Sequence, residues 1–298
     1  MKTKELLDSV NTNVIGISEL LLFRKQPPKD LHWNPGKKYK FLGEIYDTQN
    51  SKYYSAIAGK KYRPKHDEKH LDEGHFQGYR FAIQELTKPG DWILDPTVGS
   101  GTAIIEAVNN GRNGIGIELE WPDLCARNVE HQKSKNKGVV VPGNAADLNK
   151  LLGKKYKGNI QLVVNGTPYP VFKGKFSSDA PATPHNDGRN YTHGQSFGLL
   201  KWNGEYRKFI TQMYLDSLSY LKSGGYICTI IKDPIQNKQA FLLQEHIISW
   251  IMESGLVEPY GYFIHRHTPE TYFMRSYAKM FPAVRMPLYQ IGVVLRKV

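Results

Sequence analysis

The chain has 298 residues, of which 40% are hydrophobic, and this content is enough to bury one substantial core. Its 40 Lys and Arg against 28 Asp and Glu give a formal charge of +12, which favours a polyanionic partner such as nucleic acid over an acidic protein. The two cysteines exclude a disulfide framework and fit a reducing, intracellular setting. A charged amino-terminal stretch and the lack of a bilayer-length apolar run predict a cytoplasmic protein without a membrane partner.

The secondary-structure signal is weak up to about Gly74, and we treat residues 1–74 as a basic and aromatic amino-terminal extension. Residues 75–298 are expected to form one domain of alternating helices and strands. In chain order the pattern predicts a helix over 76–87, a strand over 92–95, a helix after Gly101 that stops at 109–111, a strand over 114–119, a helix over 122–133, strands over 138–141 and 161–165, a helix from 206 to 221, a strand over 226–231, a helix over 238–254, and strand-like runs over 259–265 and 289–295.

Strands separated by helices of this length imply a mostly parallel sheet covered on both faces, with ligands at the carboxyl ends of the strands. The last two strands have no obvious helix between them, and an antiparallel edge pair would fit them. The fold class predicted is therefore α/β.

A glycine loop, Asp95-Pro96-Thr97-Val98-Gly99-Ser100-Gly101-Thr102, follows the first of these strands. Gly99 and Gly101 let the backbone pass close to a ligand, and the next helix offers free N–H groups. A dinucleotide site would have a third glycine where this chain has Ile104. Asp95 would repel a pyrophosphate but attract a cationic amino group, which predicts a different nucleotide-like ligand.

Two further polar residues follow the next two strands. Glu118 ends the second strand, at the place where a carboxylate holds ribose hydroxyls, and Asn144 follows the third strand, where it can read an adenine edge. Adenosine with a cationic tail describes S-adenosylmethionine, which we expect as the cofactor.

Residues 87–120 resemble the cofactor half of the amino-methylating DNA methyltransferases, which modify N4 of cytosine or N6 of adenine. The family motif is an Asp-Pro-x-x-Gly-Ser-Gly-Thr loop followed by a strand that ends in Glu. The similarity extends over roughly 62–298, through 143–147, where the family usually has Asp and this chain has Asn144, and through 221–226 and Lys232-Asp233. A strand-to-helix turn of some other α/β protein is the alternative interpretation of the glycines.

The resemblance implies a Rossmann-like methyltransferase fold, with a mostly parallel seven-stranded sheet whose last strand is antiparallel. It implies S-adenosylmethionine as the cofactor, held by Asp95, Pro96, Thr97, Gly99, Ser100, Gly101, Thr102, Glu118 and Asn144.

The apolar run 161–164 leads into Asn165-Gly166-Thr167-Pro168-Tyr169-Pro170, whose prolines fix an extended backbone around a tyrosine. In the family, the fourth strand ends in Asp/Asn/Ser-Pro-Pro-Tyr/Phe. The polar group and the first proline carbonyl of that motif accept hydrogen bonds from the target amine, and the aromatic ring stacks on the extruded base. Aligned on the first proline, this chain exchanges Tyr and Pro; aligned on Pro-Tyr, Gly166 takes the polar position. We expect Thr167 to be the acceptor together with the Pro168 carbonyl, Tyr169 to be the stacking ring, and Asn165 to assist.

The chemistry explains this requirement. An exocyclic amine conjugated to a base is a poor nucleophile, and two acceptors on its hydrogens turn the lone pair toward the methyl donor, so that positioning and desolvation carry the rate. A hydroxyl residue at the polar position favours N4 of cytosine, because family members of that kind are more often cytosine enzymes. Methylation at C5 needs a cysteine nucleophile in this loop, and neither Cys125 nor Cys228 is near it.

Basic and aromatic residues surround this motif in the sequence. Residues 171–205 form a long insertion, either a base-holding lid or an irregular surface loop, and basic stretches occur at 60–66 and 265–267. His66 and His70 have a spacing that metal sites use, but amino-methyl transfer needs no metal and we predict none. The expected nucleic-acid contacts are Lys61, Arg63, Lys65, Lys173, Lys175, Arg189 and Arg266.

The sequence thus predicts an S-adenosylmethionine-dependent DNA methyltransferase of the restriction-modification kind, acting on a base flipped out of duplex DNA. N4 of cytosine is favoured, and N6 of adenine is the next alternative. An RNA methyltransferase of the guanine-N2 type, which uses a similar glycine loop, is a further alternative. A non-catalytic nucleic-acid-binding protein of the same fold, with a degenerate loop at 167–170, is the last. Neither the recognition sequence nor the oligomeric state has a signature in the sequence.

Overall fold

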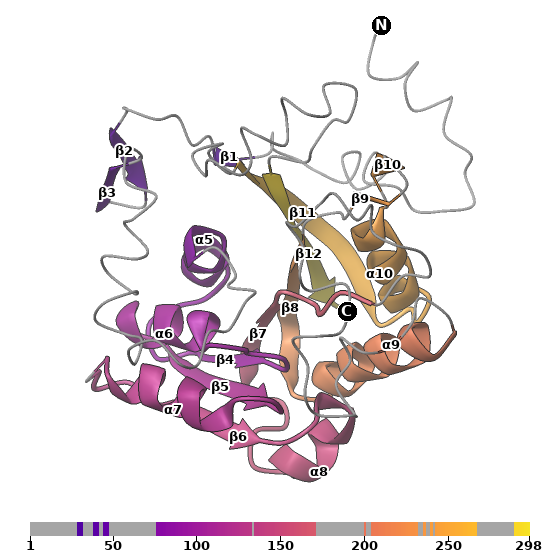
Figure 1. Cartoon of the computed structure of the whole chain (residues 1–298), viewed down its shortest axis with the longest axis horizontal. Coiled ribbons are helices and arrows are strands. Elements are labelled where there is room, and N and C mark those ends of the chain that lie inside the picture. Colours follow the sequence, from indigo (N-terminus) through magenta and orange to yellow (C-terminus); the bar gives the residue numbers. More distant parts are fainter. Residues whose placement is uncertain are drawn as a thin grey trace, which may run out of the picture.

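The computed structural model describes residues 29–31, 38–41, 44–47, 76–132, 134–170, 200, 204–231, 235–236, 239–240, 242–266 and 289–298. The strands of its main sheet are β1 (Lys29–Leu31), β4 (Trp92–Asp95), β5 (Asn113–Glu118), β6 (Gly138–Pro142), β7 (Ile160–Asn165), β8 (Leu221–Ile231), β11 (Val257–Arg266) and β12 (Tyr289–Lys297). They form one eight-stranded sheet in the order β1-β11-β12-β8-β7-β4-β5-β6 (Figure 1). Two hairpins lie outside it, formed by β2 (Lys38–Phe41) with β3 (Glu44–Asp47) and by β9 (Ile235–Gln236) with β10 (Gln239–Ala240).

Every neighbouring pair in the main sheet is parallel except those that include β12, which is antiparallel to both β8 and β11. The predicted fold class, with a mostly parallel sheet and an antiparallel last strand, is confirmed. However, β12 does not lie at an edge. It fills the gap between β8 and β11, where both of its backbone ladders are paired, whereas an edge position would leave one ladder open.

The amino-terminal residues contribute an eighth strand that the sequence did not predict. β1 pairs with β11 in parallel, with Lys29, Asp30 and Leu31 opposite Phe263, Ile264 and His265. Part of the region that we separated as residues 1–74 therefore lies on the sheet of the domain, and the division at residue 74 stays a prediction.

Helices cover both faces of this sheet (Figure 1). They are α5 (Phe76–Leu86), α6 (Thr102–Asn109), α7 (Pro122–Glu130), α8 (Leu148–Leu152), α9 (Gly204–Leu218) and α10 (Leu243–Met252), with a 3-10 turn, η2 (Ala145–Asp147), before α8. α5, α6 and α7 pack on one face, and α8, α9 and α10 pack on the other. These helices confirm the predicted alternation, although the last one is shorter than expected.

The largest difference in boundaries lies between α9 and β8. We expected the helix to reach Leu221 and the strand to start at Tyr226, but the helix ends at Leu218 and the strand starts at Leu221. The Ser223-Gly224-Gly225 run lies inside the strand, where Gly224 has φ 69° and the register with β7 shifts between Ile160 and Leu162. The glycines therefore form an irregularity within a strand rather than a turn before one.

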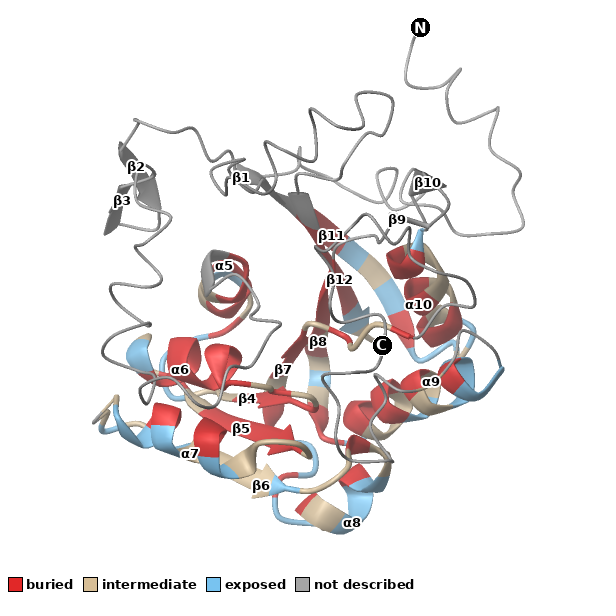
Figure 2. Cartoon of the chain, in the orientation of Figure 1, coloured by how far each residue is buried: buried red, intermediate tan, exposed pale blue. Residues whose placement is uncertain are grey.

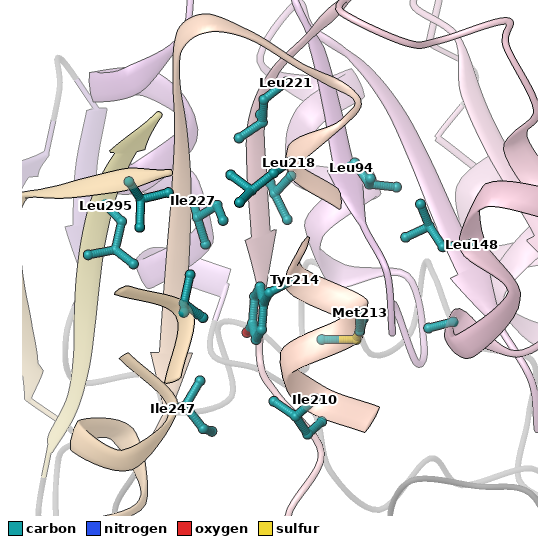
Figure 3. Packing of buried hydrophobic residues seen from close by; sticks show 14 of the residues in the cluster. Leu94, Leu148, Ile210, Met213, Tyr214, Leu218, Leu221, Ile227, Ile247 and Leu295 are labelled. Atoms are coloured by element: carbon teal, nitrogen blue, oxygen red, sulfur yellow. The ribbon is translucent and has the colours of Figure 1, made fainter. Parts of the chain in front are cut away.

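The interior is built from the central strands and the helices on either side. β4, β5 and β7 are buried along nearly their whole length (Figure 2). Figure 3 shows the largest of the three buried clusters at close range, with Leu94, Ile227 and Leu295 of the sheet and with Ile210 and Met213 of α9. A sheet buried on both faces holds the carboxyl ends of its central strands in fixed relative positions.

Gly292 gives a direct test of the packing at β12. It lies opposite Phe263 of β11, and a Cβ atom at this position would lie 2.1 Å from the Phe263 ring. The ring has little room to move, because it is buried and packs 4.8 Å from the ring of Phe81 between centroids. We expect Gly292→Ala to lower the free energy of unfolding by about 1–3 kcal/mol, measured by urea denaturation. The control is Gly204→Ala, because nothing lies within 4 Å of a Cβ atom there; equal losses in the two variants would contradict this packing.

Candidate active site

The predicted site residues gather at one edge of the sheet. β7, β4 and β5 are adjacent and parallel, and their last residues are Asn165, Asp95 and Glu118. Because the carboxyl ends of parallel strands lie at the same edge of a sheet, these three polar residues are neighbours. The residues that we expected to form the site therefore lie together at the carboxyl ends of the strands, and ligand binding there stays a prediction.

The glycine loop after β4 has the backbone conformation that its sequence requires. Gly99 has φ 57° and Gly101 has φ 102°, both in the left-handed region that favours glycine. A Cβ atom at Gly101 would also lie 3.3 Å from the sulfur of Cys125 in α7. The loop folds back on β5, because the Val98 N–H donates to the Ile117 carbonyl at 3.0 Å. The remaining predicted loop residues Pro96, Ser100 and Thr102 are buried, and Thr97 is half-buried.

Glu118 is held in place by backbone donors. Its carboxylate accepts hydrogen bonds from the N–H groups of Gly99 at 2.9 Å, Glu120 at 2.8 Å and Trp121 at 3.1 Å. Burial raises the pKa of this carboxyl and the neighbouring Glu120 carboxylate adds to the rise, while the three backbone hydrogen bonds lower it. The bond to Gly99 ties Glu118 to the glycine loop. A contact with ribose hydroxyls stays a prediction.

Asp95 is a buried carboxyl, with 2% of its surface exposed. Burial raises its pKa to about 8 and Glu118 contributes to the rise, while hydrogen bonds from the Thr97 backbone and the Asn165 side chain lower it. Among the described residues, no Lys or Arg takes part in this shift. The carboxyl is therefore mostly protonated at neutral pH, and a cationic ligand beside it would bring its pKa down.

Asn144 lies beyond β6, the strand next to β5. Its side-chain oxygen accepts a hydrogen bond from the Ala146 N–H at 2.9 Å and so caps η2. This cap fixes the direction of the asparagine side chain near the same edge of the sheet as Glu118, which pairs with Pro142 of β6. Reading of an adenine edge by Asn144 stays a prediction.

Asn165 connects the glycine loop to the segment after β7. Its side-chain N–H donates to the Thr97 hydroxyl at 2.5 Å, and its side-chain oxygen accepts from the hydroxyls of Thr167 at 3.0 Å and Tyr214 at 2.5 Å. Asn165, Thr167 and Tyr214 are all buried. One asparagine side chain thus joins the predicted cofactor residues to the predicted base residues.

The predicted base-binding residues follow Asn165 directly. The Thr167 hydroxyl lies in the interior, in contact with Asn165 and with the Tyr214 hydroxyl at 2.5 Å. The Pro168 carbonyl accepts a hydrogen bond from the Tyr206 hydroxyl at 2.7 Å. The Tyr169 ring is half-buried and packs against the apolar cluster of α9. Binding of a target amine and stacking on a base stay predictions for these three residues.

Tyr206 and Tyr214 are the site residues that the sequence analysis missed. The sequence pattern treated Tyr206 only as an apolar position of the predicted helix and predicted no role for Tyr214. The available signal was chemical, because a buried tyrosine hydroxyl needs a hydrogen-bond partner. Two tyrosines in a helix that precedes a core strand therefore indicate polar partners in the interior, although not which partners.

The expected nucleic-acid contacts are mostly outside the described residues. Lys61, Arg63, Lys65, Lys173, Lys175 and Arg189 lie there, together with Lys232-Asp233 and the histidines at 66 and 70. The backbone of Arg266 ends β11, and its side chain is not described. In the part of the chain that the structure describes, no three His, Cys, Asp or Glu residues form a group that could hold a metal ion. No helix in this part is long and apolar enough to cross a membrane.

Comparisons with known proteins agree with the resemblance seen in residues 87–120. A family model described as DNA methylase, for N6 and N4 methyltransferases, matches residues 17–123 and thus includes the glycine loop and Glu118. The chain is 29% identical over 156 residues to the type II methyltransferase M.MthZI of Methanothermobacter thermautotrophicus, covering 49% of this chain and 44% of that protein. It is 29% identical over 122 residues to the type II methyltransferase M.Cfr9I of Citrobacter freundii, covering 35% and 40%.

The matched segments span less than half the length of either relative. Among solved structures, a geranyl diphosphate methyltransferase in complex with SAM matches at 12% identity, covering 75% of this chain and 85% of that one, with a TM-score of 0.47. The sequence matches thus show a similarity to amino-methylating DNA methyltransferases, and the family model covers residues 17–123 of this chain.

The raised pKa of Asp95 predicts how stability depends on pH. The folded-state pKa of about 8 exceeds the ordinary value of 3.8, so the folded state binds more protons between these values and its stability falls as pH rises through that window. We expect Asp95→Asn, which carries no charge, to remove this slope and to raise the free energy of unfolding at pH 8 by roughly 1–3 kcal/mol. The measurement is urea denaturation at pH 6 and pH 8 without cofactor.

The matched control is Asp91→Asn, just before the other end of β4, where the carboxylate pairs with Lys222 at 3.0 Å. This variant is expected to keep the pH slope and to gain no stability. If the free energy of unfolding of Asp95→Asn depended on pH as strongly as that of the unmodified protein, Asp95 would not be a buried carboxyl with a raised pKa.

Gly166 occupies the polar position of the family motif when the motif is aligned on Pro-Tyr. A Cβ atom there would lie 2.8 Å from the hydroxyl of Tyr79 in α5, a residue that is itself buried. We expect Gly166→Ala to lower the free energy of unfolding by about 1–3 kcal/mol. Tyr79→Phe in the same background should recover about half of this loss, because it removes the atom that crowds position 166.

A double-mutant cycle measured by thermal unfolding separates this crowding from a general loss of packing. The single variant Tyr79→Phe provides the control, since it removes one hydroxyl and leaves Gly166 unchanged. Strictly additive effects of the two substitutions would show that the Tyr79 hydroxyl does not restrict position 166.

Proposed function

We propose that the chain is an S-adenosylmethionine-dependent DNA methyltransferase that methylates an exocyclic amino group in a specific sequence of duplex DNA. Its target is N4 of cytosine in preference to N6 of adenine. The observation that carries the proposal is the Asn165 side chain, which bonds to Thr97 of the glycine loop and to Thr167 of the Thr-Pro-Tyr segment. A cofactor at the glycine loop and a base at the Thr-Pro-Tyr segment would lie next to each other, as direct transfer of a methyl group from cofactor to base requires.

The residues at the ends of β4 and β5 fit S-adenosylmethionine. This molecule supplies an electrophilic methyl group on a sulfonium, and it also carries an ammonium group. Asp95 is a buried carboxyl without a described cationic partner, so it favours a ligand with positive charge. Gly99 and Gly101 leave the loop backbone open to close approach, and Glu118 has its carboxylate fixed by three backbone N–H groups. These residues would hold the cofactor together with Asn144.

The segment after β7 supplies acceptors rather than a base or a nucleophile. The Pro168 carbonyl accepts one hydrogen bond from Tyr206 and has a second lone pair for the target amine. Thr167 offers its oxygen lone pairs, and Tyr169 offers a ring next to two prolines that stiffen the backbone. Acceptors on the amine hydrogens orient its lone pair toward the methyl donor, and no covalent intermediate with the protein is needed.

Both cysteines are unsuited to attack on a cytosine ring. Cys125 and Cys228 are buried and free, and burial raises the pKa of each thiol above its ordinary value. A protonated, inaccessible thiol is a poor nucleophile, which supports methylation of an amine over methylation at C5.

The remaining parts of the proposal have indirect support. The type II names of the two relatives favour a restriction-modification role, and the charge of +12 favours DNA as partner. A base within duplex DNA would have to leave the stack to reach the Thr-Pro-Tyr segment. Phosphate contacts are expected from the lysines and arginines named from the sequence, and a DNA substrate favours a cytoplasmic location. The hydroxyl of Thr167 at the polar position supports cytosine as the target.

The product of the reaction tests this proposal. The protein is incubated with labelled S-adenosylmethionine and mixed-sequence duplex DNA, the DNA is digested to nucleosides, and the methylated nucleoside is identified by mass spectrometry. We expect N4-methylcytosine, and we expect Asp95→Ala to lower the yield about 10- to 100-fold through the loss of a charge-assisted contact. Asp91→Asn serves as the control for a carboxylate at the other end of β4.

Each other outcome has a defined meaning. N6-methyladenine would keep the reaction class and overturn the preference for cytosine. 5-Methylcytosine would overturn the amine chemistry. Methylation of structured RNA alone, or cofactor binding without any methylated product, would overturn DNA as the substrate.

A further inference from the structure

Helix α9 brings two tyrosine hydroxyls to the segment that follows β7. Tyr206 and Tyr214 both have 0% of their surface exposed. The Tyr206 hydroxyl donates to the Pro168 carbonyl at 2.7 Å, and the Tyr214 hydroxyl lies 2.5 Å from both the Asn165 oxygen and the Thr167 hydroxyl. Tyr214 otherwise lies within the apolar cluster that includes Met213 of α9 (Figure 3).

We propose that Tyr206 and Tyr214 are positioning residues for methyl transfer, an inference that rests on the proposed function. Tyr206 fixes the direction of the Pro168 carbonyl. Tyr214 fixes Asn165 and Thr167, and through Asn165 it sets the distance between the glycine loop and the Thr-Pro-Tyr segment. Neither tyrosine touches the reacting atoms, and both act through the residues that do.

The hydrogens of the Asn165 cluster can be assigned from its contacts. The Asn165 N–H donates to Thr97, which leaves the Asn165 oxygen facing Thr167 and Tyr214. Tyr214 donates its only hydroxyl hydrogen to this oxygen, and Thr167 donates its own to Asn165 or to Tyr214. The hydroxyl hydrogen of Thr167 is thus donated within the protein. The Thr167 oxygen can then only accept a further hydrogen bond, as it must if the target amine is the donor.

Burial keeps Tyr214 in its role as a donor. Removal from water raises the pKa of its hydroxyl above the ordinary value, and the Thr167 hydrogen bond lowers it. The Asp95 carboxylate, which is ionised at high pH, raises this pKa further. Tyr214 therefore stays protonated across the working pH range, so the Asn165 oxygen always receives this bond.

Tyr206 acts on the other acceptor of the segment. A carbonyl oxygen has two lone pairs, and the bond from Tyr206 occupies one of them from the protein interior. The second lone pair is left for the target amine. Because Pro168 has no N–H group and its backbone is stiff, this bond is what the protein uses to set the carbonyl direction.

Phenylalanine substitutions test the proposal, because they remove only the hydroxyls. The matched control is Tyr220→Phe: Tyr220 is equally buried, and its hydroxyl donates to the Gly153 carbonyl at 3.0 Å, next to the start of β8 and away from the site. We expect Tyr206→Phe and Tyr214→Phe each to lower kcat for DNA methylation about 10- to 100-fold. Tyr220→Phe should leave kcat within about twofold while it loses a comparable amount of thermal stability.

Comparing the effect on kcat with the effect on cofactor affinity separates a loss of positioning from a general loss of structure. For Tyr206→Phe, the Kd for S-adenosylhomocysteine, measured by calorimetry, should stay within about threefold of the unmodified protein. Unchanged kcat in both site variants, or an equal loss of kcat in Tyr220→Phe, would overturn the proposal.

A second measurement does not depend on turnover and distinguishes failure of this proposal from failure of the proposed function. If the unmodified protein methylates no nucleic acid, the proposed function fails, and amide hydrogen exchange of the peptide 160–170 is then compared with S-adenosylhomocysteine present. Faster exchange in Tyr206→Phe and Tyr214→Phe than in Tyr220→Phe would support positioning of the segment. Equal exchange in all three variants would overturn it.

Discussion

The candidate site is organised around one buried carboxyl at the end of β4. Asp95 has lost nearly all contact with water, and within the described residues it gains no cation, so the folded protein keeps it largely protonated at neutral pH. This arrangement is costly for stability, and burial without a charged partner is typical of a group held for a ligand rather than for the fold. The same carboxyl receives hydrogen bonds from the Thr97 backbone and the Asn165 side chain. The positions of the glycine loop and of the segment after β7 therefore both depend on Asp95.

The fold provides a frame stiff enough to hold such a group. The central strands are covered on both faces, with α5, α6 and α7 on one side and α8, α9 and α10 on the other (Figure 2). α9 has two roles in this frame. Its apolar side chains lie in the largest of the three buried clusters, and the hydroxyls of Tyr206 and Tyr214 hold the polar segment after β7. Packing and polar positioning therefore come from the same helix.

Much of the fold and part of the site could be predicted from the sequence. Periodicity located the central strands and their helices. Gly99 and Gly101, which we expected to let the backbone pass close to a ligand, have the left-handed backbone that favours glycine. Long-range pairing could not be predicted in the same way. β12 lies between β8 and β11, and β1 pairs with β11. Such pairings depend on which strand edges have unpaired backbone groups, and the local sequence pattern does not indicate this. The Thr167 hydroxyl meets that of Tyr214, 47 positions away, and helical periodicity treats tyrosine as apolar.

Proton release on cofactor binding would show directly whether the Asp95 carboxyl responds to a cationic ligand. The enthalpy of S-adenosylmethionine binding is measured by calorimetry at pH 7 in two buffers of different ionisation enthalpy, and the difference gives the number of protons released. With a pKa of about 8, Asp95 is mostly protonated in the free protein, and it loses its proton when a cationic ligand binds. We expect release of about one proton per molecule bound. Binding without proton release would contradict it, because the carboxyl at the end of β4 would then not respond to the charge of the ligand.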